Sequence, residues 1–502
     1  MTSIRDALGR LWSAADDARM LQCDGRWVTW RTVRDLADRI DRELTAGGCG
    51  PGGRVAVVLG NRMESVAAII AIFRAQRTLV SISPLQPIPR LSADLVASGA
   101  DYLLAPRILW SEAVFADAVA ELGAAAYSVD GGEVTSRADG EGAARSGDPS
   151  IAIEMLTSGT TGPAKRVPLQ RKQIEVSLSS ALQHNDRPET RDKPPFTGAV
   201  GMVTLPIIHI GGLFSLLQSL AAARPIVMLD RFTLSGWHHA IKEHRPVVVG
   251  LPPPAIRAVL DSDIPPEDLA SVRAVNSGTA PVDPIMVDAF VERYGIPILI
   301  TYGATEFAGA VAGWTLKDFN ASWADKKGSV GRPFPGVRLR TVDEDGTVLP
   351  AGQTGRLQVA SPQVGGTADN WVTTSDLAHI DDDGYLYFDG RADDVIVRGG
   401  FKIAPEIVVR ALRTHNAVAD AAVAGLPDAR LGQVPVAAVE LRSPLTATSD
   451  ELRAHCRTSL TPYEVPARVF VVDELPRGAA LKVDRRLLVA ALEKLTAVAQ
   501  SD

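Results

Sequence analysis

Residues 151–165 read IAIEMLTSGTTGPAK, an apolar run typical of a strand followed by a loop of glycines, hydroxyls and one lysine. The hydroxyl side chains are those of Thr157, Ser158, Thr160 and Thr161. Together with flexible glycine amides and the lysine cation, they form a set that can hold polyphosphate oxygens. A polar turn stabilised by its own Ser and Thr side chains has the same composition, so the loop alone leaves both interpretations open.

This loop differs from the P-loop of nucleoside triphosphatases, which reads GxxxxGK[ST] and continues at once into a helix. Two residues separate Gly162 from Lys165, and Arg166 stands where the P-loop has its magnesium-binding Ser or Thr. Pro168 keeps the next residues extended, so we expect the following helix to begin near Gln170. The pattern therefore indicates a phosphate clamp of another kind.

Outward from this loop, β-rich runs alternate with helical stretches from about residue 54 to residue 302, as in RVAVVLG followed by ESVAAIIAIFRAQ. Such alternation predicts an α/β fold with largely parallel, buried strands and a ligand site beyond the strand ends. After about residue 330 the chain changes to short, turn-rich strands and then to a final α+β segment. We therefore expect a large, multi-layer N-terminal α/β domain with mostly parallel sheets and a small α+β C-terminal domain.

Composition narrows the class of protein further. The 502 residues are 46% hydrophobic and 22% charged, with a net charge of -7, which describes a globular chain without a nucleic-acid partner. No stretch has the length and apolarity of a membrane span or the pattern of an export signal, so we expect no membrane insertion and a cytoplasmic location. The widely spaced Cys23, Cys49 and Cys456 are expected to be reduced bystanders.

Five short motifs occur in one order along the chain: TSGTTGPAK (157–165), YGATE (302–306), TSD (374–376), GRADD (390–394) and a lysine near the C-terminus, Lys482. In this order and spacing the chain resembles, over almost its full length, the acyl-adenylate-forming enzymes, which include acyl-CoA synthetases, nonribosomal peptide adenylation domains and beetle luciferases. The resemblance implies ATP, Mg²⁺ and coenzyme A as cofactors. It also implies a small carboxylic acid substrate, which becomes an acyl adenylate and is then passed to a thiol.

The resemblance also implies a nucleotide site. Its phosphate loop would consist of Thr157, Ser158, Gly159, Thr160, Thr161, Gly162 and Lys165. Tyr302 would stack on adenine, with Gly303 beside it and the opposite wall formed by Gly278, Thr279 and Ala280. Asp376 would accept hydrogen bonds from both ribose hydroxyls, and Arg391 would add a cation near the ribose and phosphate.

The catalytic groups follow from the same resemblance. Thr305 would contact the α-phosphate and Glu306 would hold magnesium, a hard ion that prefers carboxylate and phosphate oxygens. Lys482 would bridge the substrate carboxylate and the α-phosphate as negative charge develops. His209 would stand beside the acyl site, although a histidine satisfied within the core remains an alternative.

The implied domain organisation is residues 1–390, a hinge at 391–394 that includes Asp393, and residues 395–502 with the catalytic lysine. The small domain would first deliver Lys482 and then turn, so that Gly399 and Gly400 line a tunnel for the thiol. Lys402 in the same loop would approach the phosphate or the thiol.

Four residues depart from the family pattern: Ala164, Arg166, Ser375 and Leu481. Leu481 replaces a glycine before the catalytic lysine, which keeps open a noncatalytic nucleotide-binding protein as an alternative. The acid pocket is expected at 205–215 and 303–311, where Ile208 and His209 replace the aspartate that would bind an α-amino group. We therefore expect a simple carboxylic acid; loading of a separate carrier protein, or activation of another oxyacid such as nitrite, remain alternatives.

Other catalytic chemistry finds little support in the sequence. His238, His239 and His244 lie on one predicted helix, but their spacing does not make a metal site, and we expect them on the helix surface. No GxSxG motif occurs, which argues against a serine hydrolase.

Overall fold

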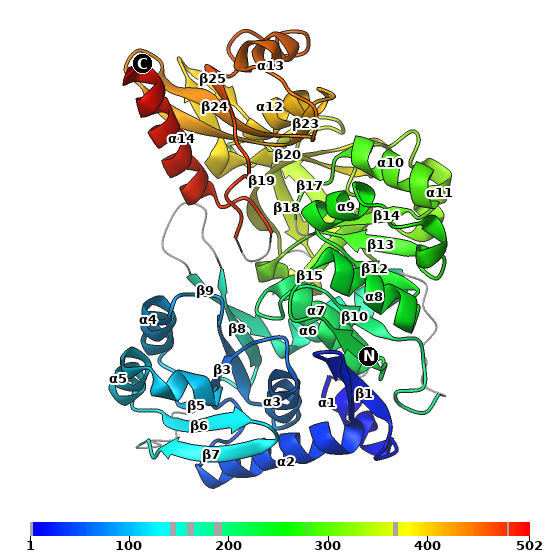
Figure 1. Cartoon of the computed structure of the whole chain (residues 1–502), viewed down its shortest axis with the longest axis vertical. Coiled ribbons are helices and arrows are strands. Elements are labelled where there is room, and N and C mark those ends of the chain that lie inside the picture. The colour runs from blue at the N-terminus through cyan, green and yellow to red at the C-terminus, as the bar shows by residue number, and fades with distance from the viewer. Residues whose placement is uncertain are drawn as a thin grey trace.

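The computed structural model describes residues 4–140, 147–157, 165–184, 193–278, 280–364, 370–478 and 481–501. Within these ranges the strands form five sheets, and the chain rises from the N-terminal layers at the bottom of Figure 1 to the C-terminal elements at the top. A mixed α/β architecture with a large N-terminal domain and a smaller C-terminal one confirms the predicted fold class.

The largest sheet has seven strands in the order β7-β6-β5-β3-β4-β8-β9, parallel except for β7 and β9 at its edges. Its strands are β3 (Arg54–Val58), β4 (Thr78–Ile82), β5 (Tyr102–Ala105), β6 (Ala125–Asp130), β7 (Glu133–Ala138), β8 (Ile151–Thr157) and β9 (Lys165–Gln170). Val55 and Val57 pack in one core while Ala56 and Val58 pack in another. Successive residues of β3 thus face opposite, helix-covered sides, as parallel strands require.

Two further sheets stack on this one. The first has the order β10-β11-β1-β2, with β1 (Arg19–Cys23), β2 (Arg26–Thr29), β10 (Gly201–Val203) and β11 (Ile226–Met228). The second runs from β12 to β16, with β12 (Val248–Gly250), β13 (Ala274–Ser277), β14 (Ile298–Ala304), β15 (Gly309–Gly313) and β16 (Arg332–Pro333). Parallel pairing ends at β14, and β15 turns back antiparallel to it, so the YGATE segment lies at a strand end.

The helices of the N-terminal layers cover these sheets. They are α1 (Ile4–Gly9), α2 (Trp30–Ala46), α3 (Met63–Arg74), α4 (Ile88–Ser98), α5 (Ala113–Leu122), α6 (Arg171–His184), α7 (Ile210–Ala221), α8 (Leu234–His244), α9 (Pro253–Leu260), α10 (Pro284–Tyr294) and α11 (Leu316–Ser322), with short 3-10 turns η1 (Arg10–Ser13), η2 (Arg107–Ser111), η3 (Pro266–Leu269), η4 (Thr305–Phe307) and η5 (Pro362–Val364). The helix predicted near Gln170 begins at Arg171, and its apolar residues Ile174, Leu178 and Ala181 are buried.

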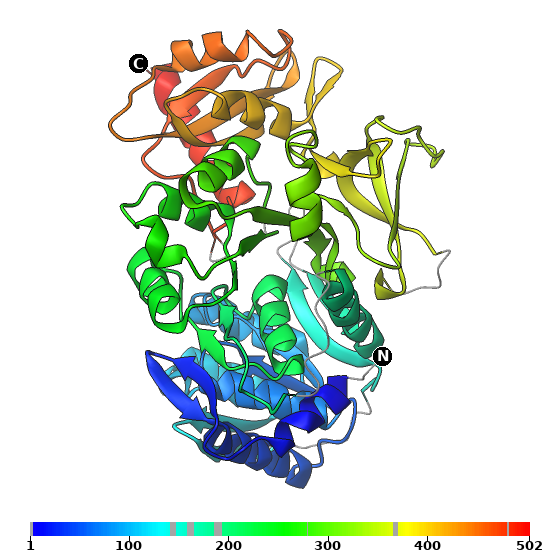
Figure 2. The same ribbon diagram turned by 90° about the vertical axis from the view of Figure 1, so that its right-hand side faces the viewer.

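A four-stranded antiparallel sheet precedes the C-terminal domain: β17 (Arg338–Val342), β18 (Gly355–Ala360), β19 (Val372–Ile380) and β20 (Leu386–Arg391). Figure 2 shows this sheet projecting to one side of the N-terminal layers, below the C-terminal elements. The change to turn-rich strands predicted after residue 330 is confirmed, and their antiparallel pairing is what the structure adds. Its last strand leads directly into the predicted hinge, the 3-10 turn η6 (Ala392–Asp394).

The C-terminal domain has one sheet flanked by helices. Its elements are β21 (Ile396–Arg398), β22 (Phe401–Ile403), α12 (Pro405–Arg413), β23 (Val418–Asp428), β24 (Gly432–Leu441), α13 (Ser449–Cys456), β25 (Arg468–Val471) and α14 (Arg485–Ser501). Residues of α12, α13, β23 and β24 share one core, and α14 packs on the other face of the same strands. The segment therefore has its own hydrophobic core, as expected of a separate domain.

The positions of the cysteines and of His244 can be compared with what the sequence predicts for them. Cys49 and Cys456 are buried, Cys23 is partly buried, and all three are free thiols. The surface position predicted for His244 is wrong: its side chain is 6% exposed, its ring lies edge-on to Trp27, and its Nε2 lies 2.7 Å from Gln22 Oε1. The spacing that excluded a metal site could not reveal this packing across distant elements. No helix in the described part of the chain is long and apolar enough to cross a membrane.

Candidate active site

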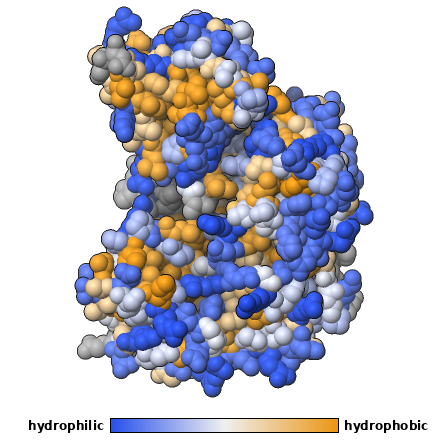
Figure 3. Space-filling model, in the orientation of Figure 1, coloured by the Kyte–Doolittle hydropathy of each residue, from blue (hydrophilic) through white to orange (hydrophobic). Residues whose placement is uncertain are grey.

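The predicted site residues converge between the N-terminal layers and the C-terminal domain. Figure 3 shows the surface hollowed at this level, between the upper and lower parts of the molecule. Tyr302 comes from β14, Asp376 from β19 and His209 from the start of α7, whereas Lys482 comes from the C-terminal domain. Segments that are 70 to several hundred residues apart in sequence thus supply one site.

Tyr302 and Asp376 are joined directly. The Tyr302 hydroxyl donates a hydrogen bond of 2.5 Å to Asp376 Oδ2, and the tyrosine is only 9% exposed. Burial, reinforced by the Asp376 charge, raises the pKa of Tyr302 well above its ordinary range. Burial also raises the pKa of Asp376, while the Tyr302 hydrogen bond and the Arg391 cation act in the opposite direction. One Asp376 oxygen is therefore committed to the tyrosine, which the sequence did not predict.

The glycines beside Tyr302 are required by close backbone approach. A Cβ on Gly303 would lie 2.3 Å from the carbonyl oxygen of Gly309, and one on Gly278 would lie 2.1 Å from Thr301 Oγ1. Both glycines are exposed, and Ala280 is half-buried. The two glycines therefore leave exposed backbone near Tyr302, and their role as an adenine wall stays a prediction.

Arg391 stands opposite Asp376 in the register of β19 and β20. Its Nε lies 3.8 Å from Asp376 Oδ1, and its Nη2 donates to Ser375 Oγ at 2.5 Å. Ser375, one of the departures from the family pattern, thus supplies an acceptor that a glycine would lack. The Arg391 Nε is buried without a hydrogen-bond partner, which leaves a donor for a ligand group beside Asp376.

The candidate metal ligand Glu306 is exposed and lies in η4, directly after Thr305. Its negative charge is one cause of the raised Asp376 pKa, so the two carboxylates lie near each other. In the described part of the chain no group of three His, Cys, Asp or Glu residues forms a ready cage for a metal. One exposed carboxylate fits Mg²⁺, which protein sites commonly hold with one or two carboxylates together with substrate phosphates.

His209 occupies the N-cap position of α7, and its side chain makes no capping hydrogen bond to the helix. Burial lowers the pKa of His209, and the positive charge of Lys482 lowers it further. Its Nε2 is buried without a hydrogen-bond partner. The alternative of a histidine satisfied within the core is therefore not what the geometry shows: burial disfavours the charged ring, and its Nε2 has no partner.

The lowered pKa of His209 predicts a pH effect on stability. The unfolded chain takes up a proton on this residue as the pH falls through its ordinary pKa of about 6.5, whereas the folded protein does not, so stability is full above that pH and falls below it. Between pH 7.5 and 5.5, we expect the free energy of unfolding measured in urea to fall by about 1 kcal/mol less in the His209→Gln variant than in the wild type. His239→Gln, on the surface, is the control; equal losses in all three proteins would contradict the assignment.

Lys482 lies on a short hairpin whose arms meet at Arg477 and Val483. The Gly478 amide donates to the Lys482 carbonyl at 2.8 Å, across the strand pair. The surrounding protein lowers the pKa of Lys482, Arg391 lowers it further, and Asp376 partly offsets both, although the side chain keeps contact with solvent. The ammonium therefore lies within electrostatic reach of Asp376.

Leu481, which replaces a family glycine, adopts a left-handed backbone with φ of +58°. A residue with a Cβ is strained there by about 1–2 kcal/mol, which is the physical reason for a glycine at this position. The hairpin nevertheless closes, because the Leu481 amide donates to the Gly478 carbonyl at 2.9 Å. The departure strains the turn without removing Lys482 from the site.

The phosphate loop lies mostly outside the described residues: Ser158, Gly159, Thr160, Thr161 and Gly162 are among those the structure does not describe, as is Thr279 of the adenine wall. Its two ends are described. Thr157 closes β8 opposite Lys165, the exposed first residue of β9. The loop therefore spans the end of an antiparallel strand pair, which agrees with the predicted strand before it and extended chain after it.

Arg166, the residue after the loop lysine, is held by a partner distant in sequence. It forms an ion pair of 2.5 Å with Asp94 of α4 and donates to the Ser81 carbonyl at 2.9 Å. Burial raises the pKa of Asp94 while Arg166 lowers it. This departure from the family pattern thus anchors β9 to α4 and β4 at the base of the loop.

The predicted hinge and thiol loop occupy separate turns. Asp393 lies in η6, 3.9 Å from Arg391 Nη2, and the Asp393 carbonyl accepts from Arg485 at the start of α14. Gly399 and Gly400 form the turn between β21 and β22 with φ of +56° and +90°, which favours glycine. Lys402 lies in β22, where only its backbone is described.

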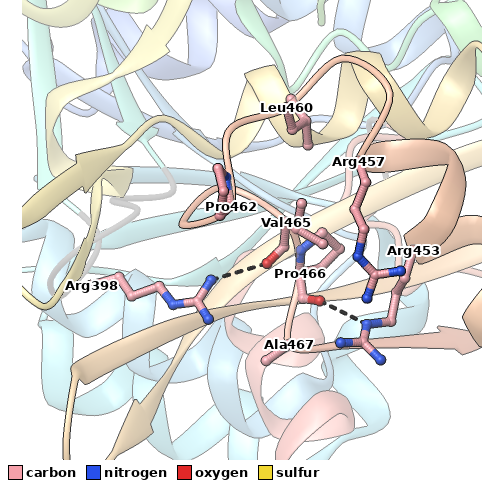
Figure 4. Close-up of a pocket in the computed structure, with 8 residues that line it drawn as sticks. All are labelled: Arg398, Arg453, Arg457, Leu460, Pro462, Val465, Pro466 and Ala467. Atoms are coloured by element: carbon pink, nitrogen blue, oxygen red, sulfur yellow. Dashed lines mark hydrogen bonds between the residues drawn. The ribbon is translucent and has the colours of Figure 1, made fainter.

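A cavity of about 370 Å³ adjoins this turn, and the sequence did not predict it. It is lined by Arg398, Arg453, Arg457, Leu460, Pro462, Val465, Pro466 and Ala467. Figure 4 shows its three arginines, of which Arg398 donates to the Tyr463 and Val465 carbonyls and Arg453 to the Pro466 carbonyl. The arginines are spread over 60 residues, so no local motif could have signalled the cluster.

Comparison with known proteins identifies the class. The model of the AMP-binding enzyme family matches residues 11–367, and that of the AMP-binding enzyme C-terminal domain matches residues 410–482. The chain belongs to the AMP-binding enzyme family. It is an adenylate-forming, acyl-CoA synthetase-like ligase, a class that uses ATP, Mg²⁺ and coenzyme A.

Individual relatives agree with this class. The oxalate–CoA ligase of Arabidopsis thaliana is 27% identical over 94% of this chain and 95% of its own length. The 2-succinylbenzoate–CoA ligase of Bacillus velezensis is 31% identical over 87% of each chain. The structure of o-succinylbenzoate coenzyme A synthetase from Bacillus subtilis with ATP and magnesium superposes with a TM-score of 0.78 at 26% identity, covering 97% of this chain and 99% of that one.

Proposed function

We propose that this carboxylate–CoA ligase adenylates its acid in the hollow between the domains, with Lys482, His209, Asp376 and Tyr302 as its principal groups. The observation that carries the proposal is the set of contacts at Asp376: its Oδ2 accepts from the Tyr302 hydroxyl at 2.5 Å, and its Oδ1 lies 3.8 Å from Arg391 Nε, a buried donor without a hydrogen-bond partner. The charge of Lys482 acts on His209, and the charge of Asp376 acts on Lys482, although the lysine belongs to the C-terminal domain.

Each group has a role that its surroundings support. Asp376 keeps one oxygen for the ribose hydroxyls, because the other accepts from Tyr302. Lys482 neutralises charge as a carboxylate oxygen bonds to the α-phosphorus and pyrophosphate leaves. Glu306 would hold Mg²⁺ together with phosphate oxygens, which lowers their charge. Thr305, at the start of η4, would donate to the α-phosphate.

In the second step, the thiol sulfur attacks the carbonyl carbon of the acyl adenylate and AMP leaves. A carboxylate resists nucleophiles, whereas its mixed anhydride with AMP has a good leaving group, which is why the reaction is divided. The left-handed turn of Gly399 and Gly400 has no side chains to obstruct a thin thiol arm, which supports its role as a tunnel wall.

We further propose that the acid lacks an α-amino group. The expected pocket segments contribute apolar, buried side chains at Ile207, Ile208, Ala308 and Val311. The relatives named above ligate oxalate and 2-succinylbenzoate, acids without an amino group. A neutral His209 with an unused Nε2 suits the carboxylate end of such an acid, either as donor or through water.

The arginine-lined cavity supports coenzyme A as the acceptor over a carrier protein. Free coenzyme A brings a diphosphate and a ribose phosphate, whereas a carrier arm brings a single phosphodiester, and guanidinium forks bind such groups strongly. We expect Arg457→Gln to raise the KM for coenzyme A about tenfold, since a charge-assisted hydrogen bond contributes about 1.5–3 kcal/mol. Adenylation without coenzyme A should be unchanged, and Arg468→Gln on β25, outside the cavity, is the control. An unchanged KM would exclude this cavity.

The test of the function is pyrophosphate release with a panel of acids: acetate, oxalate, 2-succinylbenzoate, 4-coumarate and glycine, each with and without coenzyme A. We expect release and thioester formation with at least one acid other than glycine. Release without thioester would point to another acceptor such as a carrier protein. No release with any acid, or with nitrite, would favour the noncatalytic alternative.

A further inference from the structure

An arginine at the base of the hairpin that carries Lys482 links it to the sheet of the C-terminal domain by ion pairs. Arg477 donates to Glu440 through both outer nitrogens, from Nη1 to Oε1 at 2.6 Å and from Nη2 to Oε2 at 2.9 Å. The same Nη2 also donates to Asp420 Oδ2 at 2.7 Å. The Arg477 side chain is 13% exposed, and its partners lie on the long strands β23 and β24. Such a two-pronged pair fixes orientation as well as position.

The partners of Arg477 are themselves held. The other oxygen of Asp420, Oδ1, forms an ion pair with Arg413 Nη2 of α12 at 2.6 Å. It also accepts a hydrogen bond of 2.8 Å from the backbone amide of Ala421. Glu440 also accepts the backbone amide of Leu475, two residues before Arg477, at 2.5 Å. The network therefore includes side chains from α12, β23 and β24 and the first arm of the hairpin.

The path from Arg477 to Lys482 is short and made of backbone hydrogen bonds. Arg477 pairs with Val483, the neighbour of the lysine, and the Asp484 amide donates to the Pro476 carbonyl at 2.8 Å. The strained turn at Leu481 closes the other end of the hairpin. Since that turn is an unfavourable conformation, the anchor at the base must hold the arms in register.

We propose that Arg477 is a positioning residue for adenylation: its ion pairs with Glu440 and Asp420 set the place of Lys482 and have no part in the thiol step. The inference rests on the proposed function, in which Lys482 serves only the first half-reaction. Arg477 touches neither nucleotide nor acid, and it acts through the hairpin. A lysine at this position would keep the charge but could not bond both partners in the plane of the fork.

The experiment separates the two half-reactions in the full-length enzyme. The first is pyrophosphate release with the panel acid that the wild type uses best; the second starts from the matching synthetic acyl adenylate and measures thioester formation with coenzyme A. We expect Arg477→Lys to lower kcat for pyrophosphate release about tenfold and Arg477→Gln to lower it about 100-fold. The KM for ATP should stay within twofold of the wild-type value in both variants. The thioester step should stay within twofold of the wild type, and the exposed Arg486→Gln should change neither step.

Every other outcome contradicts either the inference about Arg477 or the proposed function. An equal fall in both half-reactions would show that Arg477 only supports the fold, and no change in either would remove it from catalysis; both results overturn the inference. Should Arg477→Gln not fold, Glu440→Gln, which keeps the shape and removes the charge, carries the same expectation. If the wild type itself releases no pyrophosphate, the proposed function is wrong. If the wild type releases pyrophosphate and Arg477→Lys does so at the same rate, only the inference about Arg477 is wrong.

Discussion

The Lys482→Ala variant is expected to lose adenylate formation by a factor of about 100 to 1000, which is the usual cost of removing one preorganised group that stabilises transition-state charge. The reason is its location: the ammonium lies within electrostatic reach of His209 and Asp376, at the boundary where the two domains meet. The surrounding protein and Arg391 lower the pKa of Lys482, while Asp376 partly offsets both, and the side chain itself is exposed.

Acid-dependent pyrophosphate release measures this effect, with the exposed Lys494→Ala on α14 as the matched control. Thioester formation from a supplied acyl adenylate should survive in Lys482→Ala, because that step has no pentavalent phosphorus to stabilise. If pyrophosphate release continues at the wild-type rate, Lys482 is not the catalytic lysine. If the variant loses both pyrophosphate release and thioester formation, Lys482 stabilises the fold and is not specific to adenylation.

Asp376→Ala is expected to lower kcat/KM for ATP about 100-fold, since one or two charge-assisted hydrogen bonds to the ribose contribute about 1.5–3 kcal/mol each. Asp376 Oδ2 is already bonded to the Tyr302 hydroxyl, so the loss also leaves a buried phenol without its partner. The acid KM should change little, because Asp376 is assigned to the nucleotide alone.

Deoxynucleotides make this test specific. The wild type should prefer ATP to 2′-deoxy-ATP and 3′-deoxy-ATP, whereas Asp376→Ala should treat the three nearly alike. Asp382→Ala, in the exposed turn before β20, should keep the wild-type preference. A variant that is weak with ATP yet still discriminates among the sugars would place the ribose elsewhere.

Much of the fold was predictable because its signals are local. Strand and helix alternate visibly in the sequence, and buried positions such as Ile174 and Leu178 follow the period of a helix. The change to short strands after residue 330 is equally local, since turn residues interrupt the apolar runs. The candidate site residues depended on motif order; in the structure Tyr302 bonds to Asp376, and the charge of Lys482 acts on His209.

The rest depended on partners far apart in sequence. Tyr302 bonds to Asp376 across 74 residues, and Arg166 pairs with Asp94 across 72. The surface position predicted for His244 failed for the same reason, because Gln22 lies 222 residues away. A polar side chain can bond to many groups, and the residues next to it in sequence do not indicate which distant partner tertiary packing will bring to it.

The positions of the three cysteines make this enzyme convenient for measurements by fluorescence. Cys49 and Cys456 are buried and Cys23 is only partly accessible, so none offers a freely reactive thiol to a maleimide dye. Exposed cysteines introduced at Ala270 and Ser459, on either side of Asp393, could therefore be labelled in an otherwise native background. Energy transfer between the two dyes would then test the predicted rotation of the C-terminal domain during single turnovers.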